Sequence, residues 1–403
     1  MARILQWTHR IHQSSMKRYL IAILILTVLA PAGASAQWYL FPGSRQAKDS
    51  TAVRTSGDDF IPLRSDEEIQ EELASIRVSK IALILPFKSN STPNGNFLDF
   101  YSGVLIAADA LSSDDRRFEI DVYDSEIALP SSFQLEGVDM IIGPVGFDDV
   151  LRILPRTRGN YIISPLDPKV ASLTARHNVI QAPSGWDSQM DEIAAWVCDD
   201  LKSGDAVVLL QNPDERASDA FSRLAMTLGE KGIEYTVNAT PGAYEGLVSG
   251  TCRFILGSED EEFCSSMIRE IALMNLRGGR NVVYGTSKLR SISDLEVESI
   301  HAAGARITAS YYADPSDAKV KAFDEVYGDL FKGEPGQWVY QGYDLMMYFG
   351  STLGRERSEW VSELAATPGT GLQTDFRFDA SGKSNTAVRR LRYNANNTIT
   401  LVR

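Results

Sequence analysis

Residues 80–87 read KIALILPF and begin the stretch that decides the fold, which ends with DMIIGP at residues 139–144. Between these segments, residues 118–123 read FEIDVY. The short apolar runs at either end are typical of strands that are buried on both faces, as in parallel sheets. Residues 97–111 carry apolar side chains at helical i, i+3, i+4 and i+7 spacing, which predicts a crossover helix between the first two strands. The stretch therefore predicts the first half of a parallel α/β sheet.

The alternation of strands and helices continues along the chain. Further strands are predicted at 161–164, 179–182, 206–210, 234–237, 252–257, 281–284 and 306–311. Helices are predicted at 187–201, 214–231, 260–274, 293–303, 317–331 and 337–353. Residues 375–378, 388–393 and 398–402 alternate like antiparallel strands separated by turns. A mature chain of about 367 residues is too long for one ordinary core, so we expect two α/β lobes.

The N-terminal region has the pattern of a secretory signal peptide. Residues 17–30 are two basic residues followed by an uncharged apolar segment, and residues 31–37 read PAGASAQ, with an A-x-A cleavage site. We expect cleavage after Ala36. An uncleaved membrane anchor would need about 20 apolar residues, and the proline and glycine after the apolar segment interrupt it. Residues 1–15 lack signal character, so Met16 is an alternative start.

The chain is acidic, with 40 basic and 53 acidic residues and a net charge of −13. Removal of residues 1–36 takes away basic residues only, which makes the mature charge about −17. This balance disfavours binding to nucleic acid or to an anionic membrane surface through bulk charge. Residues 37–78 are predicted to be a flexible lead-in with a short helix at 65–76, which begins with acidic residues suited to a helix N-terminus.

Motifs of the common enzyme classes are missing from the sequence. It contains no G-x-S-x-G elbow, no H-E-x-x-H, no P-loop and no G-x-G-x-x-G after a strand. His177 and His301 lack motif-spaced ligands or nucleophiles, so we expect both to be solvated. The sequence therefore predicts a protein that is not an enzyme, with no catalytic residue, no metal site and no cofactor.

Three cysteines invite a search for a disulfide. Cys252 is expected to open a strand and Cys264 to lie one turn into the next helix, which separates them by about 10 Å. Bridged cysteines need Cα atoms within about 7 Å, so this pair is disfavoured, although the sequence leaves its oxidation state open. Cys198 shares a helix face with apolar residues and is expected to be buried.

The order of several motifs resembles the type I periplasmic binding proteins, whose best-known members are the branched-chain amino-acid-binding proteins of ABC transporters. The motifs are KIALILPF at 80–87, YSGVLIAA at 101–108, DMIIGP at 139–144, ISP at 163–165, YQGYD at 340–344 and GLQTDFRFD at 371–379. The similarity covers nearly all of residues 79–403. The chain also resembles exported bacterial relatives in which this domain accompanies peptidoglycan-binding modules, although no such module is visible in the sequence.

The resemblance implies two doubly wound α/β lobes with parallel sheets, joined by a hinge that the chain crosses three times. Lobe one would hold residues 79–184 and 316–366, and lobe two residues 187–314 and 369–403. The family implies a periplasmic location, a small-molecule ligand in the cleft between the lobes, and a membrane permease or a cell-envelope protein as partner. It implies no membrane insertion after cleavage of the signal peptide.

Ligands of open α/β sheets bind at the carboxyl ends of the strands, so the candidate cleft residues are those just past each strand. They are Lys88, Ser89, Val145, Gly146, Phe147, Ser164, Pro165, Leu166, Asp167, Asn212, Ser258, Glu259, Thr286, Ser287 and Lys288. Helix N-termini and loop N–H groups there can hold a carboxylate, and an opposing acid can hold an amine. Asp167 could equally cap a turn before Pro168, and Ser258 could equally cap the helix that follows it.

Two departures from the family pattern bear on the ligand. In the family's amino-acid binders, Ser-Pro is followed by small residues and threonine, whereas Ser164-Pro165 is followed here by Leu166-Asp167. The turn after residues 143–144 reads Val145-Gly146 where a serine-rich turn would be expected. We therefore expect an exported solute-binding protein whose ligand is not a standard branched-chain amino acid. The alternative is a protein-interaction or regulatory module of the cell envelope on the same scaffold.

Overall fold

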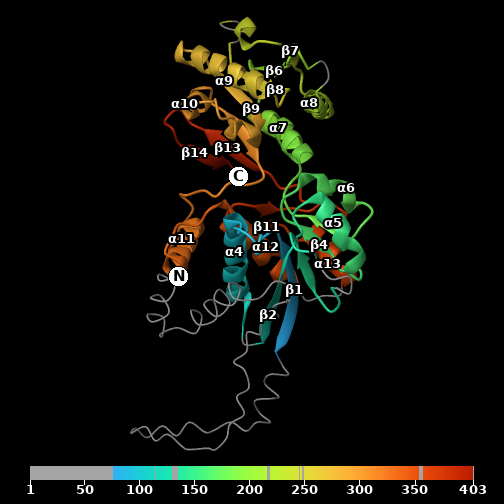
Figure 1. Ribbon diagram of the computed structural model, residues 1–403. Coiled ribbons are helices and arrows are strands. Elements are labelled where there is room, and N and C mark those ends of the chain that lie inside the picture. The colour runs from blue at the N-terminus through green and yellow to red at the C-terminus, as the bar shows by residue number, and fades with distance from the viewer. Residues whose placement is uncertain are drawn as a thin grey trace, which may run out of the picture. The chain divides into compact units, whose positions relative to one another are not determined.

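The computed structural model describes residues 76–402 except 114, 129–134, 216–217, 245, 247–248 and 354–356. The predicted signal peptide, its cleavage site after Ala36 and nearly all of the predicted lead-in with its helix lie outside the described residues. The described chain divides into two compact units (Figure 1). The first unit holds the described residues up to Asp167, together with Arg176–Val179 and Glu325–Arg357. The second unit holds Pro168–Ala175, Ile180–Asp324 and the described residues from Ser358 onward.

The first sheet confirms the parallel arrangement predicted from the opening stretch. Its strands are β1 (Arg77–Leu85), β2 (Arg116–Asp124), β3 (Met140–Ile142), β4 (Ile162–Ser164) and β5 (Val179–Gln181), in the order β2-β1-β3-β4-β5. Strand β1 is parallel to both β2 and β3, and β3 is parallel to β4. Residues 81–85 of β1 are buried throughout. Burial on both faces explains why this run is continuously apolar.

Two helices of the first unit pack closely against each other. They are α4 (Gly95–Leu111), the predicted crossover helix, and α12 (Gln337–Thr352), which lie side by side in Figure 1. The Asn94 side chain caps α4 by accepting a hydrogen bond from the N–H of Asn96 at 3.2 Å. Glycine at positions 103 and 342 allows the two backbones to approach, because a Cβ at either position would overlap the backbone of the other helix.

The second sheet is mixed. Its strands are β6 (Ala206–Leu210), β7 (Thr236–Asn238), β8 (Cys252–Leu256), β9 (Asn281–Thr286), β10 (Arg306–Ala309), β13 (Arg389–Tyr393) and β14 (Ile399–Val402). They lie in the order β14-β13-β10-β9-β8-β6-β7. The pairs from β7 to β10 are parallel, whereas β13 pairs antiparallel with both β10 and β14. The antiparallel character predicted for residues 388–393 and 398–402 is confirmed.

The remaining elements connect these strands or follow them. The helices are α5 (Phe147–Ile153), α6 (Ala171–Thr174), α7 (Trp186–Asp200), α8 (Asp219–Glu230), α9 (Glu261–Leu276), α10 (Val297–Ala302), α11 (Ala318–Phe331) and α13 (Arg357–Ala366), with short 3-10 turns at Leu154–Arg156, Pro168–Val170, Pro241–Tyr244 and Ser287–Arg290. Strands β11 (Gly369–Thr370) and β12 (Asp375–Phe376) form a separate antiparallel pair. None of the helices in the described part of the chain has the length and hydrophobicity of a membrane span.

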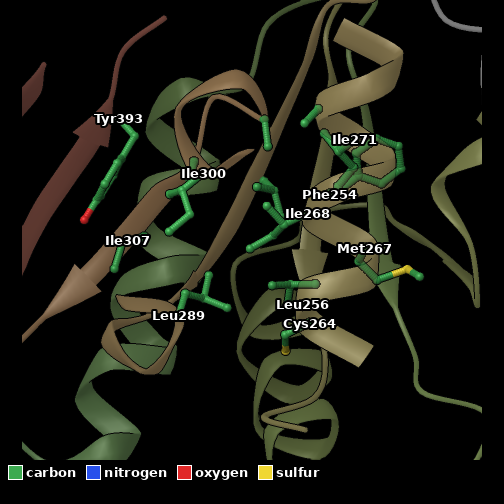
Figure 2. Packing of buried hydrophobic residues seen from close by; sticks show 14 of the residues in the cluster. Phe254, Leu256, Cys264, Met267, Ile268, Ile271, Leu289, Ile300, Ile307 and Tyr393 are labelled. Atoms are coloured by element: carbon green, nitrogen blue, oxygen red, sulfur yellow. The ribbon is translucent and has the colours of Figure 1, made fainter. Parts of the chain in front are cut away.

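The central strands of the second sheet are buried on both faces. Phe254 and Leu256 of β8 pack with Ile268 and Ile271 of α9 in one apolar cluster (Figure 2). Ile255, which lies between them in the strand, belongs to another cluster with residues of α7 and α8. Successive side chains of a strand point to opposite faces, so every residue of β8 has a buried environment.

Two predictions about single residues were wrong. His301 was expected to be solvated, but it is 4% exposed, and its Nδ1 atom lies 2.7 Å from the carbonyl oxygen of Asn394 while its ring packs on Tyr393. The covering residues come from β13 and the turn after it, about 90 positions later in the chain, so local spacing did not reveal them. Cys198 was expected to be buried but is exposed, because the buried face of α7 is centred on Ile193 and residues 196–197.

Two predicted helices begin later than expected. The helix predicted from residue 214 begins at Asp219, because Asn212 and its neighbours form a turn in which the Asn212 side chain accepts a hydrogen bond from the N–H of Asp214 at 3.1 Å. The helix predicted from residue 293 begins at Val297 and is only six residues long.

Candidate functional site

The candidate residues lie just past the carboxyl ends of parallel strands, as predicted, and they form one group in each compact unit. The first group is Lys88, Ser89, Val145, Gly146, Phe147, Ser164, Pro165, Leu166 and Asp167. The second group is Asn212, Ser258, Glu259, Thr286, Ser287 and Lys288.

In the first group, the loop after β1 is organised by Asp124, the last residue of β2. The Asp124 carboxylate accepts hydrogen bonds from the N–H of Ser89 at 2.7 Å, from its hydroxyl at 2.8 Å, and from the N–H of Phe87 at 3.1 Å. Lys88 lies between these residues with φ +55°, and its side chain is exposed. The hydroxyl of Ser89 is therefore already used to hold the loop.

Asp167 supports the start of α5. Its Oδ2 atom accepts a hydrogen bond at 2.9 Å from the backbone N–H of Phe147, the first residue of that helix. A carboxylate at this position complements the positive end of the helix. Gly146 is the N-cap and offers no side chain of its own, so Asp167 supplies the cap from 20 residues away.

Ser164 ends β4 and is completely buried. Its Oγ atom has no hydrogen-bond partner in the described part of the chain. Most buried hydroxyls are paired, so this group is one of the few polar side-chain atoms in the first unit with unused hydrogen-bonding capacity.

In the second group, Ser258 links the loop after β8 to the loop after β6. Its hydroxyl donates to Glu215 Oε2 at 2.6 Å and accepts from the N–H of Asp260 at 3.0 Å. The N-cap of α9 is Asp260, whose carboxylate accepts from the N–H of Phe263 at 2.8 Å. Ser258 therefore closes the turn before the helix rather than capping the helix itself.

Glu259 and the residues after β9 meet at the same edge of the sheet. Thr286 donates its hydroxyl proton to Glu259 Oε1 at 3.1 Å. The N–H and hydroxyl of Ser287 both donate to Gln189 Oε1 of α7, at 3.2 and 3.0 Å. The structure thus brings Ser258, Glu259 and Thr286 together around a cavity of about 10 Å³, which is room for about one water molecule.

Three residues that were not predicted take part at this edge: Cys264 lines the cavity, whereas Glu215 and Gln189 bond to Ser258 and Ser287. They come from α9, from the loop after β6 and from α7, respectively. Glu215 lies only three positions past Asn212, so a wider window after β6 would have included it. Gln189 and Cys264 lie one turn inside helices, where strand ends give no signal.

The charge at this edge is mainly negative. This edge holds three acidic residues, Glu215, Glu259 and Asp260, and one basic residue, Lys288, which lines the cavity. Burial, together with Asp260 and Glu259, raises the pKa of the Cys264 thiol to about 12. A thiol that stays protonated is neither a nucleophile nor a metal ligand. Among the described residues, no three acidic, histidine or cysteine side chains gather in a way that could hold a metal ion.

A larger cavity of about 330 Å³ lies at the opposite edge of the same sheet. It is lined by Cys252 and Asn281, which begin β8 and β9, and by Arg277 and Arg280 after α9. None of the predicted site residues lines it. Ligands of open α/β sheets bind at the carboxyl edge, so this cavity is outside the predicted site.

Solved structures with this fold include substrate-binding proteins of bacterial ABC transporters. A candidate branched-chain amino acid ABC transporter protein from Rhodospirillum rubrum matches with a TM-score of 0.60 and 17% identity, covering 81% of this chain and 100% of that chain. A substrate-binding protein from Desulfitobacterium hafniense, solved with leucine, matches with a TM-score of 0.50 and 12% identity, with the same coverage. The predicted type I periplasmic binding fold is confirmed.

Another ABC transporter substrate-binding protein from Desulfitobacterium hafniense matches with a TM-score of 0.51 and 12% identity, covering 81% of this chain and 100% of that chain. At such identities the likeness shows the fold alone. No model of a protein family matches the sequence, and no curated protein matches it.

Proposed function

We propose that this protein is an exported, non-enzymatic solute-binding protein that captures a small ligand between two lobes. Lobe one would consist of residues 79–184 and 316–366, and lobe two of residues 187–314 and 369–403, joined by three crossings of the chain. The ligand closes the lobes because it contacts both only in the closed form, which shifts the population toward that form. The protein works in the periplasm and delivers its ligand to a membrane permease.

The observation that carries this proposal is the convergence of polar side chains at the carboxyl edge of the second sheet. Ser258, Glu259 and Thr286 come from the ends of two adjacent parallel strands and meet around one cavity. Glu215 and Glu259 each use one carboxylate oxygen in the hydrogen bonds described above. Each carboxylate has further acceptor capacity, which suits an amine or another hydrogen-bond donor on a ligand.

We further propose that the ligand is not a standard branched-chain amino acid. Recognition of such a ligand needs donors for its carboxylate and acceptors for its amine. In the first unit the Ser89 hydroxyl is bound to Asp124, and the Asp167 carboxylate caps α5. The Ser164 hydroxyl is unpaired but completely buried. This unit therefore offers few side-chain groups for an amino-acid backbone.

The test is thermal unfolding of residues 37–403 with amino acids, small peptides, sugars and peptidoglycan fragments. A ligand at 100 times its Kd adds about 2.7 kcal/mol to the free energy of unfolding. For any compound that binds, Glu259→Gln and Thr286→Val are expected to raise Kd at least tenfold. The control is Glu298→Gln, which changes an exposed acid on α10. Absence of a shift with every compound would contradict the proposal.

A second candidate function is a protein-interaction module of the cell envelope. The observation that favours it is the small volume of the cavity, about 10 Å³, where two of the lining residues, Thr286 and Glu259, bond to each other. A scaffold that binds a protein partner does not need space for a solute. Specific capture of one envelope protein by residues 37–403, together with no response to any solute, would support this function over solute binding.

A further inference from the structure

Helix α7 begins without a side-chain cap. Its N-cap residue is Gly185, which has no side chain to accept a hydrogen bond from the first turn. Asn94, Ser218 and Asp260 supply such an oxygen at the starts of α4, α8 and α9. A helix of 15 residues concentrates partial positive charge and N–H donors at its N-terminus. The start of α7 therefore has a place for an oxygen acceptor that its own N-cap does not fill.

A buried amide lies beside this helix end. Gln181, the last residue of β5, is 2% exposed, and its Nε2 atom has no hydrogen-bond partner in the described part of the chain. Nε2 is 3.5 Å from the position that a Cβ atom would occupy on Gly185. The Gln181 backbone is fixed, because its N–H donates to Lys383 O at 2.8 Å and its carbonyl accepts from the N–H of Asn385 at 3.1 Å. A donor is thus held next to an uncapped helix start.

Trp186 contributes a second unused donor. It is the first residue of α7, and its indole Nε1 atom is buried without a hydrogen-bond partner in the described chain. The ring packs against the apolar cluster that includes Met190 and Ile193, which fixes the side chain. An indole N–H can donate but cannot accept, so only a ligand with an acceptor atom can pair with it.

The acid in the first turn of α7, Asp187, has a cation in its neighbourhood, Arg223 of α8. The hydrogen bond that Arg223 donates to Asp191, together with the charges of Asp191 and Asp187, raises the pKa of the Arg223 guanidinium on α8. Asp187 therefore interacts favourably with Arg223. This attraction opposes, without cancelling, the repulsion that the Asp187 carboxylate exerts on an anion at the helix start, because the ion pair of Arg223 is with Asp191.

We propose that the start of α7, together with Gln181 and Trp186, is a subsite for an anionic oxygen group of the ligand, a carboxylate. The two side-chain atoms without partners here, Gln181 Nε2 and Trp186 Nε1, are N–H donors, and together with the positive end of the helix they favour an anionic oxygen over a cation. The inference rests on the proposed function, because it assigns one chemical group of the captured solute. The acidic residues Glu215 and Glu259 lie at the carboxyl edge of the second sheet, where they suit the opposite charge.

The test uses simple probes, because the natural solute is not needed to occupy a subsite. ¹⁵N-labelled protein of residues 37–403 is titrated with acetate, inorganic phosphate or methylammonium at constant ionic strength. The indole N–H resonance of Trp186 is identified by its loss in Trp186→Phe. We expect this resonance to shift saturably with acetate and not with methylammonium. Gln181→Leu removes the donor, and Gly185→Ala fills the space beside it. Each substitution is expected to raise the Kd for acetate at least fivefold.

Trp360→Phe, at a buried tryptophan of α13, is the matched control and should leave acetate binding unchanged. A saturable response to methylammonium alone, or equal acetate affinity in the parent and in Gln181→Leu, would overturn the subsite. Tighter binding of phosphate than of acetate would overturn the assignment to a carboxylate and would indicate a phosphate group on the ligand instead. The result is independent of the solute panel, so failure of the subsite is distinguishable from failure of solute binding.

Discussion

A Cβ atom at Gly342 of α12 would overlap the carbonyl oxygen of Phe100 in α4. Gly103 of α4 makes the reciprocal approach to Val339. Gly342→Ala and Gly103→Ala are therefore expected to lower the free energy of unfolding by about 2 kcal/mol, because overpacking costs about 3 kcal/mol and alanine recovers about 1 kcal/mol of helix propensity. Denaturant unfolding measures the change.

The control for these glycines is Gly229 in α8, where an added Cβ would meet nothing within 4 Å in the described chain. Gly229→Ala should stabilise the protein by about 1 kcal/mol through helix propensity alone. If Gly342→Ala were stabilising as well, the close approach of the two helices would be refuted.

The side chain of Asn385 joins three segments that are distant in the sequence. Its amide nitrogen donates to the carbonyl oxygens of Ala182 and Asp375, each at 2.8 Å, and its Oδ1 atom accepts from the N–H groups of Arg377 and Ala387, each at 2.9 Å. Asn385→Ala should lower the free energy of unfolding by about 3 kcal/mol, because it leaves these backbone groups unpaired. Calorimetry measures the change, with the exposed Asn96→Ala as control. A cost below 1 kcal/mol would contradict this role.

The strands of the fold were predictable because burial on both faces leaves a continuous apolar run. The predicted bounds of residues 206–210 agree with β6, and the apolar run in the DMIIGP segment forms β3. Arg253 in β8 shows what such a pattern does not reveal. This arginine is 5% exposed and bonds to Asp205 Oδ2 at 2.6 Å and to the Tyr284 hydroxyl at 2.9 Å. Its partners lie 48 and 31 positions away, so only the tertiary structure identifies them.

The strand ends that hold the candidate residues were predictable, but the hydrogen bonding around them was not. Parallel strands end at one edge, which is why Ser258 and Thr286 were both assigned there from the sequence. Which side chains are already paired depends on contacts between separate loops, such as Ser89 with Asp124. The uncapped start of α7 and the unpaired amide of Gln181 could not be recognised before the backbone placed them together.

An ion pair between the buried Arg389 of β13 and the partly exposed Asp375 of β12 holds these two strands together. Arg389 is 4% exposed and donates to Asp375 Oδ1 at 2.6 Å and to the carbonyl oxygens of Gly371 and Leu372 at 2.8 and 2.9 Å. Arg389→Met should lower the free energy of unfolding by about 3 kcal/mol, because it leaves Asp375 without its buried partner. Arg152→Met, which breaks an exposed pair with Asp149, should cost less than about 1 kcal/mol. Equal costs in urea unfolding would refute the distinction.

Thiol reactivity should separate the three cysteines. Cys198 is exposed on α7, whereas Cys252 and Cys264 are buried, and burial raises the pKa of each of these two thiols to about 12. A raised thiol pKa lowers the thiolate fraction at every pH below it, and the thiolate is the reactive form. At pH 8, iodoacetamide should therefore modify the native protein at Cys198 alone, as read by mass spectrometry of its peptides.

Cys198→Ser should abolish this modification in the native state, while urea should expose the other two thiols together as the second unit unfolds. All three cysteines are free in the structure, so unfolded protein without reductant should react at all three. Detection of a peptide that joins Cys252 to Cys264 would contradict the packing of both thiols. Fast labelling of Cys264 in the folded protein would show that the edge around Ser258 and Glu259 opens to solvent, and would leave more room for a ligand than the cavity of about 10 Å³ provides.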